Sequence, residues 1–183
     1  MASATCRFVL VAVIALGACS GGGSPAQTAG SPTTLSTATS GATAETLPLV
    51  GGISDAVKAL EAKLGGPQQY FEINATAHLI NLIVALNDGK VAQPWVYLDG
   101  ELSSTQGSAA NGFSFAASAL DFEPNQVLGK LQAQLPESSP DLFFVEGGEG
   151  GTVRYSVAVT SKQGGQLVVT VGPDGSVQSV TPN

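Results

Sequence analysis

The chain of 183 residues is poor in the side chains on which catalysis, metal binding and nucleic-acid binding depend. It contains two cysteines, one histidine (His78), and seven Lys and Arg against fourteen Asp and Glu. A single imidazole cannot build a multi-histidine metal site, and any Ser-His-Asp triad would depend on that one ring. Phosphate contacts need clustered cations, and none are clustered here. We therefore expect a protein that is not an enzyme, without catalytic residues, metal or cofactor, and with no nucleic-acid partner.

Charged residues make up only 11% of the chain, while Gly, Ala, Ser, Thr and Val dominate, as in β-rich proteins outside the cytoplasm. Four acids cluster loosely: Glu137, Asp141, Glu146 and Glu149. Their spacing fits no calcium-binding loop, so the pattern favours a solvated acidic surface. The glycine-rich stretch 147–151 lacks the Lys-Ser/Thr of a phosphate-binding loop and reads as a mobile hairpin connection.

A long apolar run is also missing. The stretch from Phe8 to Leu16 is about half of the ~20 residues that a membrane-spanning helix needs. Arg7 precedes it, and the small residues Gly17 and Ala18 follow. This order is typical of a secretory signal peptide. We expect a signal peptide over residues 1–18, cleaved between Ala18 and Cys19.

The residues Leu16-Gly17-Ala18-Cys19 resemble the lipobox of bacterial lipoproteins. The resemblance implies that Cys19 carries a thioether-linked diacylglycerol, becomes the mature N-terminus and anchors the protein on the outer side of the cell membrane. Ordinary secretion with a free Cys19 is the alternative. Cys6 would leave with the signal peptide, so no intrachain disulfide is expected.

Removal of Arg7 leaves six cations against fourteen acids, a net charge of −8. This sign makes electrostatic binding to anionic lipid unfavourable, so acyl chains would provide the membrane attachment. Residues 19–50 are rich in Gly, Ser, Thr, Ala and Pro and nearly uncharged, which predicts a disordered tether. Such a flexible segment spans roughly 30 Å on average and about 100 Å when taut.

Residues 51–183 predict a single α+β domain in which an antiparallel sheet carries two helices on one face. A helix is expected with Ser54 as its N-cap, because Ile53, Val57, Leu60 and Leu64 recur at helical spacing and Gly65-Gly66-Pro67 would end it. A second helix should begin at Pro124, present Val127, Leu128, Leu131 and Leu135 inward, and stop at Pro136. The expected strands are 70–73, 77–86, 95–98, 101–102, 113–122, 142–145, 152–160, 166–171 and 176–180.

The order of helix and strands occurs twice, which predicts two tandem repeats, about 51–122 and 123–183. Asp99-Gly100 and Asp174-Gly175 would be equivalent hairpin turns, which explains both aspartates without catalysis. The alternative is that any α+β domain shows such patterns when the offset is free. In either case, short turns between alternating strands predict antiparallel pairing.

Two features indicate binding. The stretch 77–86 is apolar on both faces, so either it is covered on both sides or one face lines an apolar cavity. Trp95 and Tyr97 share one face of a predicted strand, and Phe113 and Phe115 share one face of another; core packing is the favoured interpretation for these aromatics. For His78, at the start of an apolar strand, a structural role is favoured.

Two family resemblances bear on function. Trp95-Val96-Tyr97-Leu98-Asp99-Gly100-Glu101-Leu102 and the later Glu123-Pro124-Asn125-Gln126-Val127-Leu128 are similar to a stretch of the actinobacterial glycolipid-carrier lipoproteins. That resemblance implies a lipid or glycolipid ligand held between sheet and helices. The paired helix-plus-sheet repeats instead resemble tandem PepSY or β-lactamase-inhibitor-like modules, which implies an extracytoplasmic protein ligand. We expect a lipid-anchored binding protein of the envelope, with lipid or glycolipid slightly favoured and a protein-binding or inhibitory module as the alternative.

Overall fold

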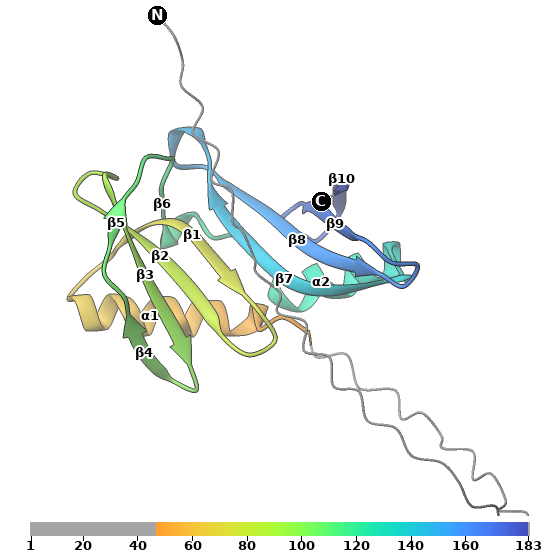
Figure 1. Cartoon of the computed structure of the whole chain (residues 1–183), viewed down its shortest axis with the longest axis horizontal. Helices are drawn as coiled ribbons and strands as arrows, with labels where there is room; N and C mark the ends of the chain where they lie inside the picture. Colours follow the sequence, from red (N-terminus) through yellow and green to blue (C-terminus); the bar gives the residue numbers. More distant parts are fainter. Residues whose placement is uncertain (1–46, 183) are drawn as a thin grey trace, which may run out of the picture. The chain divides into compact units, whose positions relative to one another are not determined.

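The computed structural model describes residues 47–182. The predicted signal peptide, the cleavage site at Ala18 and Cys19, and the predicted tether as far as residue 46 lie outside these residues. Within them the chain forms one antiparallel sheet of ten strands and two α-helices, so the expected α+β class is confirmed (Figure 1).

Helix and strands follow one another in the first half of the domain as the sequence predicts. A short 3-10 helix leads into the first α-helix, and a meander of four strands follows: η1 (Val50–Gly52), α1 (Ile53–Leu64), β1 (Gln69–Ala75), β2 (Ile80–Leu86), β3 (Val91–Leu98) and β4 (Glu101–Ser104). A connection with three short elements then leads to the second half: β5 (Ser108–Ala109), β6 (Phe115–Ala116) and η2 (Ala117–Ala119).

The second half again begins with a helix and continues as a meander: α2 (Pro124–Gln134), β7 (Ser138–Gly147), η3 (Glu149–Gly151), β8 (Val153–Ser161), β9 (Gln166–Val171) and β10 (Val177–Pro182). The strand β7 is much longer than the predicted 142–145, whereas β9 has the predicted limits. The spatial order is β10-β9-β8-β7-β1-β2-β3-β4, so the two meanders are joined through the pairing of β1 with β7. That junction pairs Glu72 through Ala75 with Glu146 through Phe143.

The two ends of α1 show which local sequence signals set the limits of the helix. Gly65 takes the left-handed conformation at the C-cap (φ 84°), and its N–H bonds to the Glu61 carbonyl, as expected for a terminal glycine. The predicted N-cap is wrong: Ser54 lies inside the helix, and Gly52 is the N-cap residue. The preceding turn η1 explains the shift, because it continues into α1 and removes the need for a side-chain cap.

Asp-Gly pairs lie in turns at both expected hairpins, but the predicted equivalence of the two turns is wrong: two residues connect β3 to β4, whereas residues 172–176 connect β9 to β10, and only Gly175 (φ 82°) among these five has a positive φ. Residues 87–90 connect β2 to β3, with Asn87 (φ 51°), Asp88 (φ 54°) and Gly89 (φ 76°) in the left-handed region, and Asp99 (φ 51°) with Gly100 (φ 86°) connects β3 to β4. In the two-residue β3–β4 turn, positive φ at both central residues is the backbone of a type I′ turn, whose twist matches that of the flanking strands. These aspartate and glycine residues are therefore explained by turn geometry.

The predicted strand at 113–122 is wrong. Only Phe115 and Ala116 pair, against Tyr70 and Gln69 at the start of β1. From Glu72 onward, β7 occupies the same edge of β1, so no partner remains for a longer strand. The chain instead turns through η2 toward α2.

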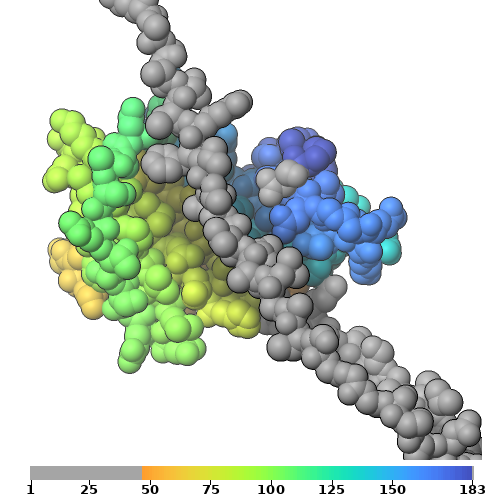
Figure 2. Space-filling view, in the orientation of Figure 1, coloured from red at the N-terminus to blue at the C-terminus, as the bar shows by residue number. Residues whose placement is uncertain are grey.

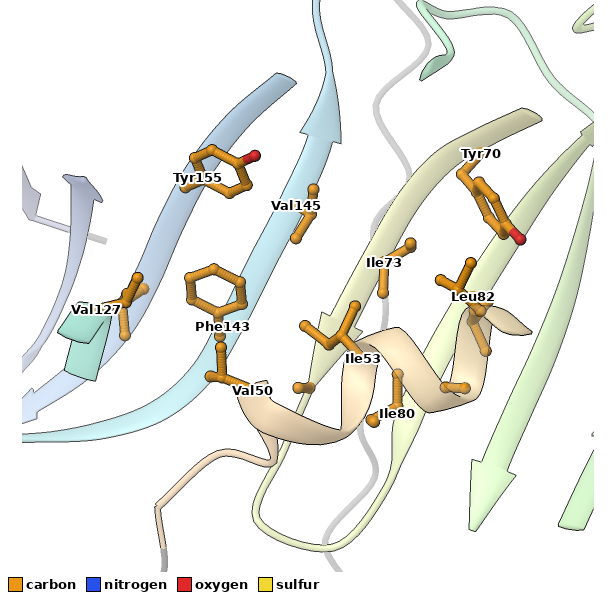
Figure 3. Packing of buried hydrophobic residues seen from close by; sticks show 14 of the residues in the cluster. Val50, Ile53, Tyr70, Ile73, Ile80, Leu82, Val127, Phe143, Val145 and Tyr155 are labelled. Atoms are coloured by element: carbon orange, nitrogen blue, oxygen red, sulfur yellow. The ribbon is translucent and has the colours of Figure 1, made fainter. Parts of the chain in front are cut away.

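One hydrophobic core contains buried side chains from the sheet and from both helices. The buried side chains come from alternate positions of the central strands and from one side of each helix; those labelled in Figure 3 include Ile53, Ile73, Leu82, Val127, Phe143 and Tyr155. Val50 of η1 is 2% exposed and points toward Phe143 of β7 in this view. Pro48 is also buried, so packing extends ahead of the predicted start at residue 51.

The opposite set of strand positions is only half-buried. Asn81, Ile83 and Ala85 of β2 alternate with the buried Ile80, Leu82 and Val84. Within residues 47–182, the apolar second face of 77–86 is therefore only partly covered.

In the space-filling view the first half of the domain, orange to green, and the second half, cyan to blue, occupy opposite sides (Figure 2).

Candidate functional site

A groove of about 480 Å³ lies between α1 and the segment that leads into α2. Its apolar lining comes from both walls: Ile53 and Val57 on α1, and Ala117, Leu120, Phe122 and Pro124 on the other side. Four polar residues complete the lining: Ser54, Lys58, Glu61 and Ser118. Volumes of this size are typical of small-molecule sites, and a predominantly apolar lining with few polar groups is the usual composition.

The α1 wall is rigid because its inner side belongs to the core. Ile53, Ala56 and Leu60 are fully buried, and Val57 is 5% exposed where it borders the groove. The helical repeat places Ser54, Lys58 and Glu61 along the same outer edge, one turn apart. The groove therefore has an apolar floor and a polar rim.

The opposite wall is held by aromatic packing and by one tyrosine. The centroid of the Phe122 ring lies 5.4 Å from the ring centroids of both Phe143 and Tyr155. The Tyr155 hydroxyl donates to Asp121 Oδ1 at 2.8 Å and accepts from the Asp121 N–H at 3.1 Å. Burial is the main reason that the pKa of Tyr155 is raised to about 12. The segment between η2 and α2 is thus fixed although it is not a strand.

Glu61 is held in one orientation at the rim. Its Oε1 accepts from the Gln68 N–H at 3.1 Å and from the Tyr70 hydroxyl at 3.4 Å. Burial, followed by the Glu61 charge, raises the pKa of Tyr70 well above its usual range, so Tyr70 stays a hydrogen-bond donor. Among the side-chain hydrogen bonds of residues 47–182, none involves Glu61 Oε2. Lys58 is more loosely placed: its Nζ lies 3.7 Å from Asp55, and both side chains are more than 70% exposed.

The residues singled out from the sequence are not gathered at this groove. Cys19 and Ala18 lie outside the described residues. His78 is exposed in the turn before β2, where its backbone N–H donates to Thr76 Oγ1, so its side chain has no role in the core. Asp174 accepts from Ser176 and Lys130, and these hydrogen bonds lower the pKa of its carboxyl group far below the usual value.

The four loosely clustered acids do not converge either. Glu146 pairs with Arg154 at 3.7 Å, and Asp141 accepts from the Thr160 hydroxyl at 2.6 Å. No group of three or more His, Cys, Asp and Glu within residues 47–182 is arranged to hold a metal ion. Nor does any helix in this part of the chain have the length and apolarity needed to cross a membrane.

Comparison with protein-family models, with curated proteins and with solved structures finds no match. The chemistry of the groove therefore has to be argued from its own residues.

Sequence reasoning misses the groove because most of its second wall falls in the predicted strand 113–122. Ala117, Leu120 and Phe122 belong to that stretch, and the pattern marks Pro124 only as the start of a helix. The available signal is Pro124 itself, which disfavours a helical residue before it and so indicates a bend at Glu123. Of the aromatics, Trp95 and Phe115 are buried as predicted, but Phe113 is 57% exposed because no strand forms there.

Proposed function

We propose that the protein is a non-enzymatic lipoprotein, anchored through acyl chains on Cys19 to the outer face of the cell membrane, whose domain binds a lipid or glycolipid of the envelope. The observation that carries the binding part is the groove of about 480 Å³ between α1 and residues 117–124. The anchor part is carried by the lipobox-like residues 16–19.

The groove suits a lipid because its floor is apolar and its rim is polar. Burial of a methylene group stabilises a complex by about 0.8 kcal/mol, so a chain of some ten methylenes outweighs a moderate cost of association. A head group would then lie beside Ser54, Lys58, Glu61 and Ser118 at the rim.

The test is lipid analysis of protein purified with its acyl chains from bacterial envelopes. An organic extract of the wild-type protein should contain a specific co-purified lipid by mass spectrometry. Ser118→Trp, at an exposed lining position, should block the groove and remove that lipid. Ser179→Trp, exposed on β10, is the matched control and should retain it. Equal extracts from the two variants would contradict binding in the groove.

We further infer that the two halves are tandem repeats whose helices cover the same sheet face. The symmetric strand order β4-β3-β2-β1 and β7-β8-β9-β10 supports this, because each half is a helix followed by a four-strand meander. The half-buried Ile83 beside the fully buried Leu82 supports an uncovered opposite face. Leu82→Thr should then be far more destabilising than Ile83→Thr in urea unfolding.

This half-buried face favours the alternative function, a protein-binding or inhibitory module. Apolar Ile83 and Val96 lie beside polar Asn81 and Ser103 on it, a mixture usual in protein interfaces. A protein ligand would be lost on Ile83→Glu, while any lipid in the groove would remain. Pull-down from envelope extracts with the wild type, Ile83→Glu and Ser118→Trp separates the two functions.

A further inference from the structure

The volume of the groove and the pairing of charges on its rim restrict the ligand more narrowly than the class of lipids. We propose that the groove holds one acyl chain of a lipid whose head group is an uncharged polyol, such as a sugar or glycerol. This inference rests on the proposed lipid-binding function and specifies its ligand.

The volume argues for one chain. A methylene group is similar in size to a water molecule, whose share of volume is roughly 30 Å³. A space of about 480 Å³ therefore accommodates at most about sixteen methylenes, the length of a single long acyl chain. A lipid with two or three such chains would leave most of its apolar surface in water.

The rim argues for a neutral head group. Glu61 and Lys58 lie one helical turn apart on the same edge of the groove, so a head group of either charge that binds its opposite partner there also lies close to a like charge. A polyol avoids both repulsions: its hydroxyls donate to Glu61 Oε2 and accept from Lys58 Nζ. The hydroxyls of Ser54 and Ser118 can do either.

The fixed orientation of the Glu61 carboxylate favours a hydroxyl-bearing head group. Because the Gln68 N–H and the Tyr70 hydroxyl both bond to Oε1, the carboxylate is positioned before any ligand arrives. A preorganised acceptor loses little conformational entropy on binding a hydroxyl. The exposed Lys58, in contrast, must be ordered on binding and contributes less.

The experiment compares three amphiphiles with the same chain, below their micelle concentrations: dodecyl maltoside, dodecyl phosphate and dodecyltrimethylammonium. The protein is the full chain carrying Cys19→Ala, so that its own acyl chains do not compete. Calorimetry should show maltoside binding at least tenfold tighter than either charged probe. Decyl maltoside should bind about tenfold more weakly than dodecyl maltoside, because two methylenes are lost.

Two rim variants test the assignment of charges, each with thermal unfolding as a check that the fold is intact. Glu61→Gln should weaken maltoside binding several-fold and strengthen phosphate binding. Lys58→Gln should strengthen binding of the ammonium probe and change maltoside binding less. Equal or tighter binding of a charged probe to the wild type, or equally tight binding of a two-chain glycolipid, would overturn the inference.

Ser118→Trp distinguishes failure of this inference from failure of the proposed function. If a charged or two-chain amphiphile binds best and Ser118→Trp removes that binding, the groove is a lipid site with another ligand, and only the present inference is wrong. If no probe shows binding that depends on Ser118, lipid binding in the groove is itself contradicted. Ser179→Trp again serves as the control.

Discussion

At the scale of single residues, the glycines of the two Asp-Gly turns differ in how closely other atoms pack against them. A Cβ added at Gly100 (φ 86°) would meet no atom within 4 Å, whereas a Cβ added at Gly175 (φ 82°) would lie 2.6 Å from the Cα of Val127. The β9–β10 turn is thus packed against α2, and the β3–β4 turn is free.

Replacing each glycine by alanine separates backbone strain from steric overlap. Gly100→Ala should cost about 1 kcal/mol, the usual penalty for a left-handed alanine. Gly175→Ala should cost about 3 kcal/mol, because overlap with the α2 backbone adds to the same strain. Urea unfolding of both variants measures the difference, and equal losses would show that the turn is not packed on α2.

Tyr155 should make the free energy of unfolding decrease at alkaline pH. Its pKa is raised from 10 to about 12, mainly by burial. Below pH 10 the tyrosine is protonated in both states and its contribution is complete. Between pH 10 and 12 only the unfolded chain loses the proton, so the free energy of unfolding should fall across this window.

The variant Tyr155→Phe isolates that contribution. At neutral pH it should lose about 1 kcal/mol, because two hydrogen bonds with Asp121 disappear. Its unfolding free energy should decline less steeply from pH 10 to 12 than that of the wild type. Some decline should remain, since the pKa of the buried Tyr70 is raised in the same direction. Identical profiles would contradict the assigned role of Tyr155.

At the scale of elements, the turn η1 does more than precede a helix. It packs against α2 as well as α1, and its Val50 points toward Phe143 of β7. A three-residue element thereby connects the two halves through their helices, while β1 and β7 connect them in the sheet.

Val50→Ala should therefore cost about 2 kcal/mol, from the lost methyl groups and the cavity left behind. Leu49→Ala is the matched control, because Leu49 is the neighbouring residue and is 42% exposed; its cost should stay below about 0.5 kcal/mol. Chemical denaturation of both variants tests this, and equal effects would mean that η1 is not part of the core.

Local patterns predicted most elements but not their partners. Gly65, Pro124 and the positive-φ turns act through their own backbone, so their effects could be derived from the sequence. The strand at 113–122 could not be judged in this way, because β7 occupies the edge of β1 that it would have needed. That competition depends on residues far apart in the chain.

At the scale of the whole molecule, the proposed anchor predicts where the protein is found. Cys19→Ala should move it from the membrane fraction to the soluble extracytoplasmic fraction, because the chain would lose its acyl groups. Immunoblots of fractionated cells measure this change. Retention of the variant in the membrane fraction would contradict the lipid anchor, and Ser20→Ala provides a control that should stay membrane-bound.

The sequence by itself determined the α+β class, the end of α1, the start of α2 and the hairpin turns. Each of these follows from interactions among neighbours in the chain or from the alternation of apolar residues. Only the tertiary structure decided the β1–β7 junction, the shortness of β6 and the groove between α1 and residues 117–124. The physical reason is that a sheet edge pairs with one strand at a time, so whether a segment forms a strand there depends on which distant strand already occupies that edge.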